Sequence, residues 1–464
     1  MTGSGSHHHL SDADAFALML ERDPVLRSTI VAIATLDQPP SWPVLVERVE
    51  RATRLSPQFR MKLALPPLPV APPRWVVDPD FDLRWHLRRS RLPGDGARSD
   101  LLELARNLGM EAFDLDRPLW MFTLVDGLED GRAALVIKVH HSLTDGIGGI
   151  ELAANVVDLQ REPADLGPLP EAPTAGDTGI LDEWTAPIAV QAERLAGSLR
   201  RAAGVAPRAA LRAATRPVAT VGEAIGTGLA LARFARPITS QCSTVMTERS
   251  LRRHFSELDL PFDRLRAAAR RVDATVNDAF LSGISGGMRH YHELHGAPVD
   301  RLRLVMPVNV REPDDPIGGN RVTLPRFEVP VGIADPGVRT AEIGRLVRQV
   351  RSDPAIPLSQ HLASVLNLLP VSITGGMLKR VDFVASDVPG FREQVYLAGS
   401  RIDAFHAFSP TLGSAVNVTL MSYAGTCHLG VNTDEAAIPD PDTFLTCLQK
   451  GFDDRILIKD LSFT

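Results

Sequence analysis

Residues 134–149 read ALVIKVHHSLTDGIGG, and this stretch decides how the rest of the chain is interpreted. An apolar run that ends in two histidines and a glycine-rich turn predicts a strand that opens into a helix. Because successive side chains on a strand point to opposite faces, Leu135 and Val139 share a face with His141. His140 lies on the other face. The pattern therefore predicts that only one of the two histidines enters a given cleft.

The same stretch contains a candidate general base. The unperturbed pKa of histidine, about 6.5, leaves the imidazole mostly neutral at cellular pH, so His141 is suited to take a proton from a hydroxyl group without a serine or cysteine nucleophile. Asp145 stands where the next helix begins, where it caps the helix or holds a cation, and Gly146 permits a tight turn. Metal binding by His140 and His141 is not expected, since adjacent strand residues diverge and no third ligand is evident.

Length and composition limit the class of protein. The chain has 464 residues, above the size at which single cores stop growing, so we expect two domains. Its 50 Lys and Arg residues against 56 Asp and Glu residues give a net charge of −6, so the chain has no overall positive charge to attract nucleic acid. Three cysteines without close pairing predict free thiols in a reducing compartment. No apolar stretch approaches the roughly 20 residues that cross a bilayer, which predicts a cytoplasmic protein.

Alternating strand-like and helix-like segments predict a mixed α/β fold. Ser11 is expected to cap a first helix, followed by a strand at 30–36 and a helix at 42–53. Residues 188–203 and 221–234 are helix-like and interleave apolar and basic positions, so they either pack on the domains or lie on a membrane surface. The expected division is a tag-like or disordered start at 1–9, an N-terminal domain at 10–157, an Ala/Arg/Pro-rich helical connector at 158–247 and a C-terminal domain at 248–464.

Residues 140–146, HHSLTDG, resemble the HHxxxDG motif of CoA-dependent acyltransferases related to chloramphenicol acetyltransferase. Further blocks make the chain similar to the bacterial wax ester synthase/diacylglycerol acyltransferase family: PLW at 118–120, ND at 277–278, MPVNVR at 306–311 with GGN at 318–320, and SDVPG at 386–390. The resemblance implies an α/β fold of two chloramphenicol-acetyltransferase-like domains, with the helical connector and an active-site channel between them.

The resemblance also assigns roles to residues. His141 is the implied catalytic base, and Arg311 is expected to pair with Asp145 and fix the loop that presents it. The residues implied to support the motif are His140, Asp145, Gly146, Arg311, Asn277 and Asp278. The substrate-channel candidates are Pro118, Leu119, Trp120, Asn309, Asn320, Ser386 and Asp387.

Several of these positions have a second interpretation. Taken alone, the segment 118–120 is more typical of a proline turn with a buried Trp120. Capping is the favoured interpretation of Asn277 and Asp278, because both residues are common at helix N-termini. Asn309 stands where serine is common in the family, and Asp387 replaces the usual asparagine with a charge. Three further histidines, at 290, 292 and 295, are expected at the exposed end of a helix.

The implied activity is direct transfer of a fatty acyl group from acyl-CoA to the hydroxyl of diacylglycerol or a long-chain alcohol. No cofactor is expected, because acyl-CoA takes part as a substrate. No metal is expected either. The expected partners are these lipids and a peripheral membrane or lipid-droplet surface at the inner face of the plasma membrane. A polyketide or glycolipid acyltransferase and a lipid-binding protein with weak turnover are the alternatives, and the sequence leaves acceptor and chain length open.

Overall fold

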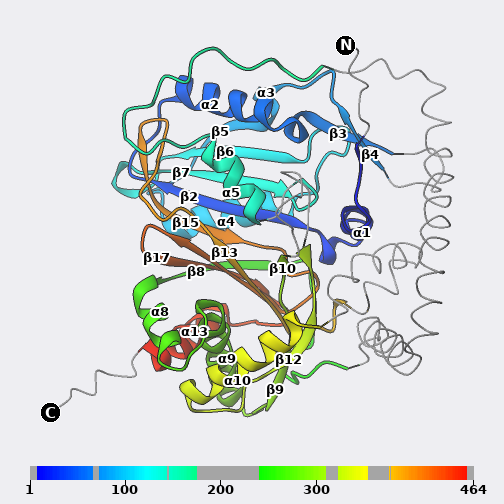
Figure 1. The fold of residues 1–464 in the computed structure, drawn as a ribbon, viewed down its shortest axis with the longest axis vertical. Helices are drawn as coiled ribbons and strands as arrows, with labels where there is room; N and C mark the ends of the chain where they lie inside the picture. Colours follow the sequence, from blue (N-terminus) through cyan, green and yellow to red (C-terminus); the bar gives the residue numbers. More distant parts are fainter. Residues whose placement is uncertain are drawn as a thin grey trace, which may run out of the picture.

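Figure 1 shows the fold of the chain in a computed structural model. The structure describes residues 8–65, 73–143, 146–174, 240–309, 322–353, 376 and 378–456. The helices expected at 188–203 and 221–234 lie outside these residues. The described parts of the expected connector, 158–174 and 240–247, contain no helix.

A six-stranded sheet forms the centre of the N-terminal half. Its order is β14-β15-β2-β7-β6-β5. Its strands are β2 (Thr29–Leu36), β5 (Leu87–Arg91), β6 (Trp120–Asp126), β7 (Ala133–His140), β14 (Tyr396–Leu397) and β15 (Ser400–Phe408). The domain boundaries predicted from composition remain a prediction, but β14 and β15 belong to this sheet although that division places them in the C-terminal domain.

The helices of this half cover both faces of the sheet. They are α1 (Asp12–Leu20), α2 (Trp42–Leu55), α3 (Leu83–His86), α4 (Arg98–Met110) and α5 (Gly146–Ala154). As the sequence predicts, Ser11 caps α1, because its hydroxyl accepts a hydrogen bond from the backbone N–H of Asp14 at 3.1 Å. A small sheet, β1-β4-β3, lies beside this half, with strands β1 (His8–His9), β3 (Met61–Ala64) and β4 (Arg74–Val77).

The C-terminal half has a second six-stranded sheet, in the order β12-β9-β13-β16-β17-β8. Its strands are β8 (Arg253–Pro261), β9 (Arg301–Val305), β12 (Arg326–Pro330), β13 (Phe383–Pro389), β16 (Val416–Tyr423) and β17 (Thr426–Asp434). A two-stranded ladder joins β10 (Val308–Asn309) to β11 (Val322–Thr323). The helices are α8 (Phe262–Arg270), α9 (Val276–Leu294), α10 (Pro336–Arg351) and α13 (Pro441–Ile456).

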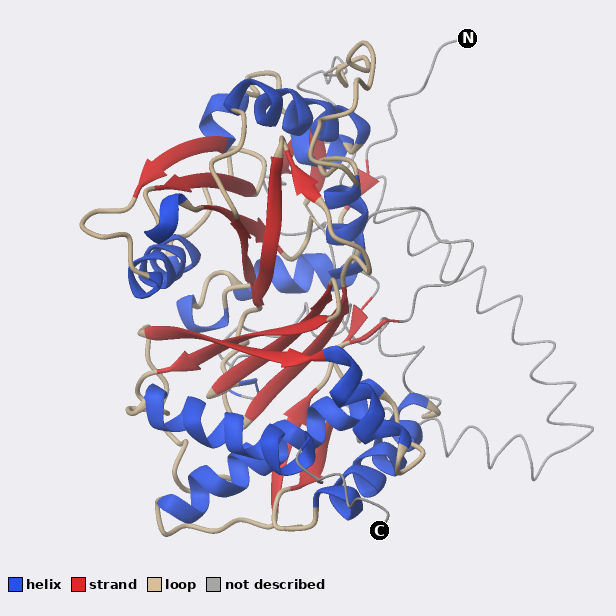
Figure 2. Ribbon diagram, turned by 90° about the vertical axis from the view of Figure 1, so that its left-hand side faces the viewer, coloured by secondary structure: helices blue, strands red, loops and turns tan. Residues whose placement is uncertain are grey.

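Figure 2 shows one sheet above the other, with helices at the top and bottom of the molecule and further helices between the sheets. In the C-terminal half, α9 packs closely against α13 over a core that contains Phe280, Phe444 and Phe452. In the N-terminal half, α4 packs on one face of the sheet, and Leu101 and Ala105 of this helix meet Val31 and other strand residues. The helix α4 also contacts β8 of the C-terminal sheet, so it lies at the junction of the two halves.

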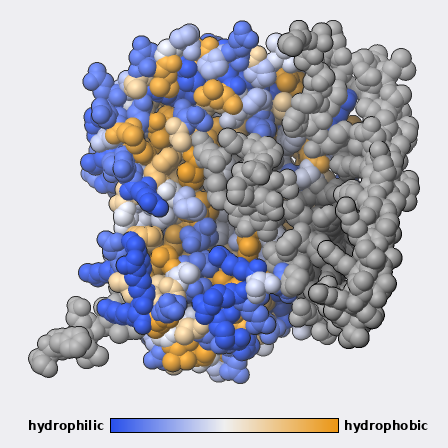
Figure 3. Space-filling view, viewed as in Figure 1, coloured by the Kyte–Doolittle hydropathy of each residue, from blue (hydrophilic) through white to orange (hydrophobic). Residues whose placement is uncertain are grey.

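The surface alternates between hydrophilic and hydrophobic patches on the face shown in Figure 3. Within the described ranges, no helix is both long and apolar enough to cross a membrane.

Candidate active site

An elongated cavity of about 270 Å³ lies between the two sheets and α5. Its walls come from both sheets: β15, β2 and β7 with α5 on one side, and β13 and β16 on the other. The residues that line it include Ile30, Ala32, Ala34, Leu135, Ile137, Val139, His141, Ile150, Ser386, Asp387, Val388, Phe391, Ile402, Phe405, Ala407, Ser409, Thr419, Met421 and Tyr423. Most of these side chains are apolar, so the cavity suits a hydrocarbon chain with one polar region.

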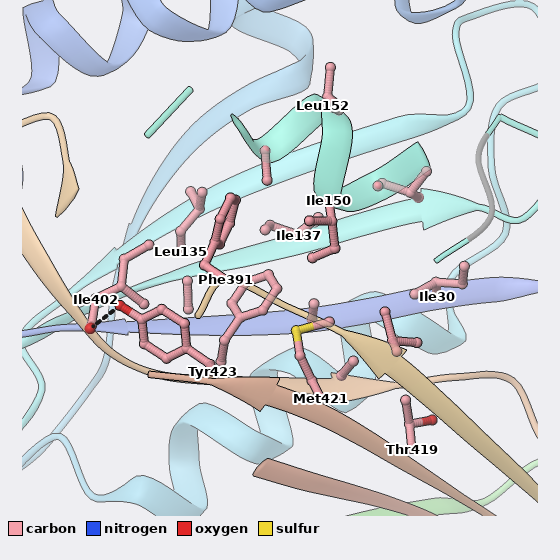
Figure 4. Close-up of a pocket in the computed structure, with 18 of the residues that line it drawn as sticks. Ile30, Leu135, Ile137, Ile150, Leu152, Phe391, Ile402, Thr419, Met421 and Tyr423 are labelled. Carbon is pink, nitrogen blue, oxygen red and sulfur yellow. Dashed lines mark hydrogen bonds between the residues drawn. The ribbon is translucent and has the colours of Figure 1, made fainter. Parts of the chain in front are cut away.

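The polar lining residues gather at one end of the cavity. Strand pairing places Thr29 beside His140 and Ser386 beside Thr419. Ile30 and Thr419 accordingly lie at the same end in Figure 4. His141 follows directly after β7 at this end. The cavity therefore has a polar end, which contains His141, Ser386 and Thr419.

The other end is apolar. Ala34 pairs with Leu135, six residues before His141, and Ile402 pairs with Leu36, two residues beyond Ala34. Figure 4 shows Leu135, Ile402 and Tyr423 close together at this end. A strand advances about 3.3 Å per residue, so the apolar end lies about 20 Å from His141 along β7.

Tyr423 closes the apolar end while its hydroxyl is fully bonded outside the cavity. The hydroxyl donates to the carbonyl of Ile402 at 2.8 Å and accepts from the backbone N–H of Val395 at 3.1 Å and from Gln394 Nε2 at 2.6 Å. Burial raises the pKa of Tyr423. The ring therefore presents an apolar surface to the cavity without leaving a buried polar atom unpaired.

The two histidines of the motif lie on opposite sides, as the strand alternation predicts. Leu135, Ile137, Val139 and His141 all line the cavity. The backbone N–H of His141 donates to the carbonyl of Ser28 at 2.9 Å, which fixes the point where β7 ends. The imidazole of His141 is thus the basic side chain at the polar end.

His140 faces away from the cavity and is buried. Its Nδ1 lies 3.1 Å from the Ser142 backbone N–H and accepts from it, which leaves the proton on Nε2, 3.2 Å from Glu21 Oε1. Burial raises the pKa of Glu21, but the hydrogen bonds from His140 and Ser28 outweigh it and leave the pKa below its ordinary value. His140 therefore ties the end of β7 to the residue that follows α1.

Lys138 shares the face of His140 and is also buried. Its Nζ donates to the carbonyl of Glu111 at 2.9 Å and lies 4.6 Å from the centre of the Phe113 ring. Burial lowers the pKa of Lys138 to about 8. The opposite side of β7 is consequently a polar support and not part of the cavity.

Ser386 and Asp387, two of the channel candidates, line the cavity from β13. Ser386 is buried, whereas the carboxylate of Asp387 is accessible at the cavity wall. The surrounding protein nonetheless desolvates this carboxylate and raises its pKa to about 6, and Arg351 offsets only part of the effect. Asp387 is thus a weak acid that changes charge close to neutral pH.

Pro118, Leu119 and Trp120 are not among the residues that line the cavity. The Trp120 ring is buried, stacks on His86 with 4.6 Å between ring centres and donates from Nε1 to the carbonyl of Phe59 at 2.8 Å. The carbonyl oxygen of Leu119 accepts a hydrogen bond from the backbone N–H of His140 at 2.9 Å. In place of channel contacts, this segment supplies core packing behind the wall, which is the interpretation that the motif favours when it is taken alone.

Asn277 and Asp278 begin α9, and neither lines the cavity. Asp278 forms a capping box with Thr275: its backbone N–H donates to Thr275 Oγ1 at 3.2 Å, and its Oδ2 accepts from the Thr275 backbone N–H at 2.9 Å. Asn277 Nδ2 lies 3.7 Å from Met306 Sδ. The favoured interpretation, helix capping, agrees with this geometry for Asp278.

The remaining predicted residues cannot be placed as side chains. Asp145, Arg311 and Asn320 lie outside the described residues, and with them the expected Asp145–Arg311 pair. Gly146 begins α5, and Asn309 is described only as a strand residue of β10, paired with Val322.

Sequence reasoning missed most of the C-terminal wall. Phe405, Ala407 and Ser409 of the β15 region and Met421 of β16 line the cavity. The only sequence signal was period-two alternation, which identifies a strand face but not the cavity that the face borders. Among the described residues, the one group of three side chains able to hold a metal ion, Asp259, His406 and His428, is not part of this lining.

Two sheet-containing halves with a histidine-ended strand at their junction define the class of CoA-dependent-acyltransferase-like folds. Residues 10–280 match the wax ester synthase/diacylglycerol acyltransferase catalytic domain, and residues 318–454 match the WS/DGAT C-terminal domain. The chain therefore belongs to the wax ester synthase/diacylglycerol acyltransferase family, and it is an acyltransferase.

Named relatives are similar over nearly the full length. A putative diacylglycerol O-acyltransferase of Mycobacterium tuberculosis is 37% identical over 99% of this chain and 94% of its own length. A probable diacylglycerol O-acyltransferase of the same organism is 29% identical over 88% of this chain and 89% of its own length.

Solved structures share the fold. The wax ester synthase/diacylglycerol acyltransferase of Marinobacter aquaeolei superposes with a TM-score of 0.63 at 20% identity, covering 96% of this chain and 98% of that one. The first condensation domain of the calcium-dependent antibiotic synthetase gives a TM-score of 0.62 at 14% identity, with coverage of 98% and 96%. The mixed α/β architecture expected from the sequence is confirmed.

Proposed function

We propose that the chain transfers a fatty acyl group from acyl-CoA to the hydroxyl of diacylglycerol, of a long-chain alcohol, or of both. The observation that carries the proposal is the cavity, which is apolar along its length and has His141 at its polar end. Both substrates pair a hydrocarbon chain with one reacting polar group, so this distribution fits them. The names of the relatives from Mycobacterium tuberculosis point to diacylglycerol as an acceptor.

In the proposed reaction, His141 takes the proton of the acceptor hydroxyl as its oxygen attacks the thioester carbonyl. The carbon–sulfur bond then breaks, and the imidazolium returns the proton to the departing CoA thiolate. No acyl-enzyme forms, and the products are an ester and CoA. A general base typically contributes about 10²- to 10⁴-fold, so orientation in the cavity supplies a further part of the rate.

The fatty chain of the donor extends from His141 towards Tyr423 in this proposal. Burial of a methylene group stabilises a complex by about 0.8 kcal/mol, so the apolar wall supplies binding free energy away from the reacting atoms. The cavity lies between the sheets, so this position also keeps the thioester apart from bulk water.

Two further parts of the proposal concern residues outside the described ranges. Arg311 pairs with Asp145 and holds the loop that presents His141. The basic amphipathic segments of the connector contact a membrane or lipid-droplet surface. Liposome flotation of the full chain and of a variant lacking 188–234 tests the second part, and equal binding by both would contradict it.

The activity is tested with palmitoyl-CoA and either diolein or hexadecanol, by CoA release and mass spectrometry of the lipid product. His141→Ala should abolish product formation. His290→Ala is the matched control, because His290 pairs with Asp454 at 2.7 Å, away from the cavity, and should leave turnover unchanged. Equal turnover by His141→Ala and the wild type would refute the role of His141, and absence of product with both acceptors would refute the acceptor class.

A further inference from the structure

Three side chains from three strands converge at the junction of the two sheets, outside the cavity. His406 of β15, His428 of β17 and Asp259 of β8 each offer a ligand atom, and these atoms lie within 4.8 Å of one another. Asp259 Oδ1 is 2.8 Å from His406 Nε2 and 2.7 Å from His428 Nδ1. Both imidazoles are buried, whereas 53% of the Asp259 side chain is exposed.

His406 lies between two carboxylates. Its Nε2 faces Asp259, and its Nδ1 lies 3.3 Å from Glu257 Oε1 without forming a hydrogen bond. Two negative charges beside one buried imidazole favour a cation at this position.

We propose that His406 Nε2, His428 Nδ1 and Asp259 bind one divalent transition-metal ion, of which Zn²⁺ fits best. Two imidazoles and one carboxylate form a donor set that zinc uses in proteins, with a further position left for water. The exposed side of Asp259 gives the ion and this water access from solvent. Because the ligands join β15 of one sheet to β8 and β17 of the other, the ion acts as a structural link between the halves.

Metal binding requires the ligand atoms to move. Zinc–ligand bonds of about 2.0–2.1 Å place tetrahedral ligand atoms roughly 3.3 Å apart, so the Asp259 oxygen must retreat by about half an ångström from each imidazole. Asp259 is the most exposed of the three ligands and lies on β8, the edge strand of its sheet. It is therefore the ligand best able to move when the ion binds.

A second carboxylate lies beside the proposed ligand His406. With the metal on Nε2, the proton lies on Nδ1, which is buried without a hydrogen-bond partner 3.3 Å from Glu257 Oε1. Glu257 is the carboxylate to which it would donate, in the arrangement that orients many metal-binding histidines. Glu257 is held in turn by Arg98, whose Nε and Nη2 lie 2.8 and 2.6 Å from its two carboxylate oxygens. The charge of Arg98 is thereby paired with Glu257 and does not oppose a cation at Asp259.

The site is separate from the reaction centre. His406 alternates on β15 with Phe405 and Ala407, which line the cavity, and so points to the opposite face of the strand. This assignment differs from the expectation of no metal, which considered only His140 and His141 and found no third ligand near them. The three ligands lie far apart in sequence and meet only through strand pairing.

The test is Zn²⁺ binding by the full chain after chelator dialysis, measured by competition with a chromophoric chelator. Because consecutive histidines also bind zinc, the background carries His7→Ser, His8→Ser and His9→Ser. One equivalent of Zn²⁺ should bind and raise the melting temperature, and Co²⁺ should give the visible absorption of a tetrahedral complex. His406→Asn and Asp259→Asn should abolish this binding, and Glu257→Gln should weaken it about 10- to 100-fold.

Asp263→Asn, an exposed carboxylate on the neighbouring α8, is the matched control and should bind zinc as the background does. Asp259→Asn tests the ligand set even where His406→Asn fails to fold, because Asp259 is half-exposed. Zinc uptake that disappears with His7–His9, or that survives both ligand substitutions, would overturn the proposal. So would a chain that binds no zinc in this assay.

Discussion

Filling the apolar end of the cavity should shorten the fatty chain that the protein accepts. Ala34 lines the cavity level with Leu135, about 20 Å of strand from His141. An extended chain advances about 1.2 Å per bond, so a hydrocarbon reaches Ala34 only at about 16 carbons. Ala34→Leu adds three carbons to this wall, and an octanoyl chain ends well before them.

The magnitude follows from the methylenes displaced. Three methylenes at about 0.8 kcal/mol each give about 2.4 kcal/mol, or roughly a 60-fold loss of kcat/KM for palmitoyl-CoA. Octanoyl-CoA should be used as well as before. The variant without substrate should be slightly more stable than the wild type, because added carbons fill space that is otherwise unoccupied by side chains.

The assay measures kcat/KM for acyl-CoA donors from eight to eighteen carbons with one fixed acceptor, together with the urea midpoint of each protein. Ile33→Leu is the control, because Ile33 lies in the same strand but packs on the α4 side of the sheet. A loss of equal size at every donor length, or dependence on the length of the alcohol alone, would refute the placement of the acyl chain.

Three further predictions concern charge and packing around the cavity. Burial lowers the pKa of Lys138 to about 8, from 10.5 in the unfolded chain. Below pH 8 the buried ammonium group therefore destabilises the folded chain to its full extent, and this destabilisation disappears as the pH rises from 8 to 10.5. Over that window urea unfolding should show the wild type gaining about 3 kcal/mol relative to Lys138→Met, and parallel curves would contradict this. Gly430→Ala would place a Cβ 2.1 Å from the carbonyl oxygen of Ala407, so it should lower the free energy of unfolding by about 1–3 kcal/mol in the same assay. Gly376→Ala is the control and should leave the free energy of unfolding unchanged, because the added Cβ would have no described atom within 4 Å. Asp387 has a pKa of about 6, so above that pH its negative charge in the cavity opposes the developing oxyanion. This charge should lower kcat/KM between about pH 5 and 7 in the wild type, and Asp387→Asn should remove that decline. The same pH profile in both proteins would contradict this effect.

Local patterns in the sequence predicted the side of the strand on which each motif residue lies. Period-two alternation separated His141 from His140 and Lys138, because a strand leaves no other arrangement once one face is apolar. Helix starts were equally accessible, since a capping residue such as Ser11 acts only on its own first turn.

Features that depend on strand order could not be predicted in this way. The sequence placed β15 with the C-terminal domain, although it pairs with β2, because nothing local specifies a partner several hundred residues away. His292 is buried and lies 2.9 Å from Ser243, contrary to the expected exposed end of the helix. A polar residue late in an amphipathic helix is normally exposed, and the partner that satisfies this one is distant in sequence.

The strand β15 explains why the two halves should act as one unit. Phe405 and Ala407 border the cavity on one face of this strand, and His406 meets the opposite sheet on the other face. Gly430 of β17 approaches the backbone of Ala407 so closely that no side chain fits between them. Neither half can therefore move away without opening the cavity wall. A cavity between two sheets keeps a defined shape only when such contacts hold the sheets in position. A structural link at His406 would therefore preserve the shape of the cavity, and with it the reaction, without contacting a substrate.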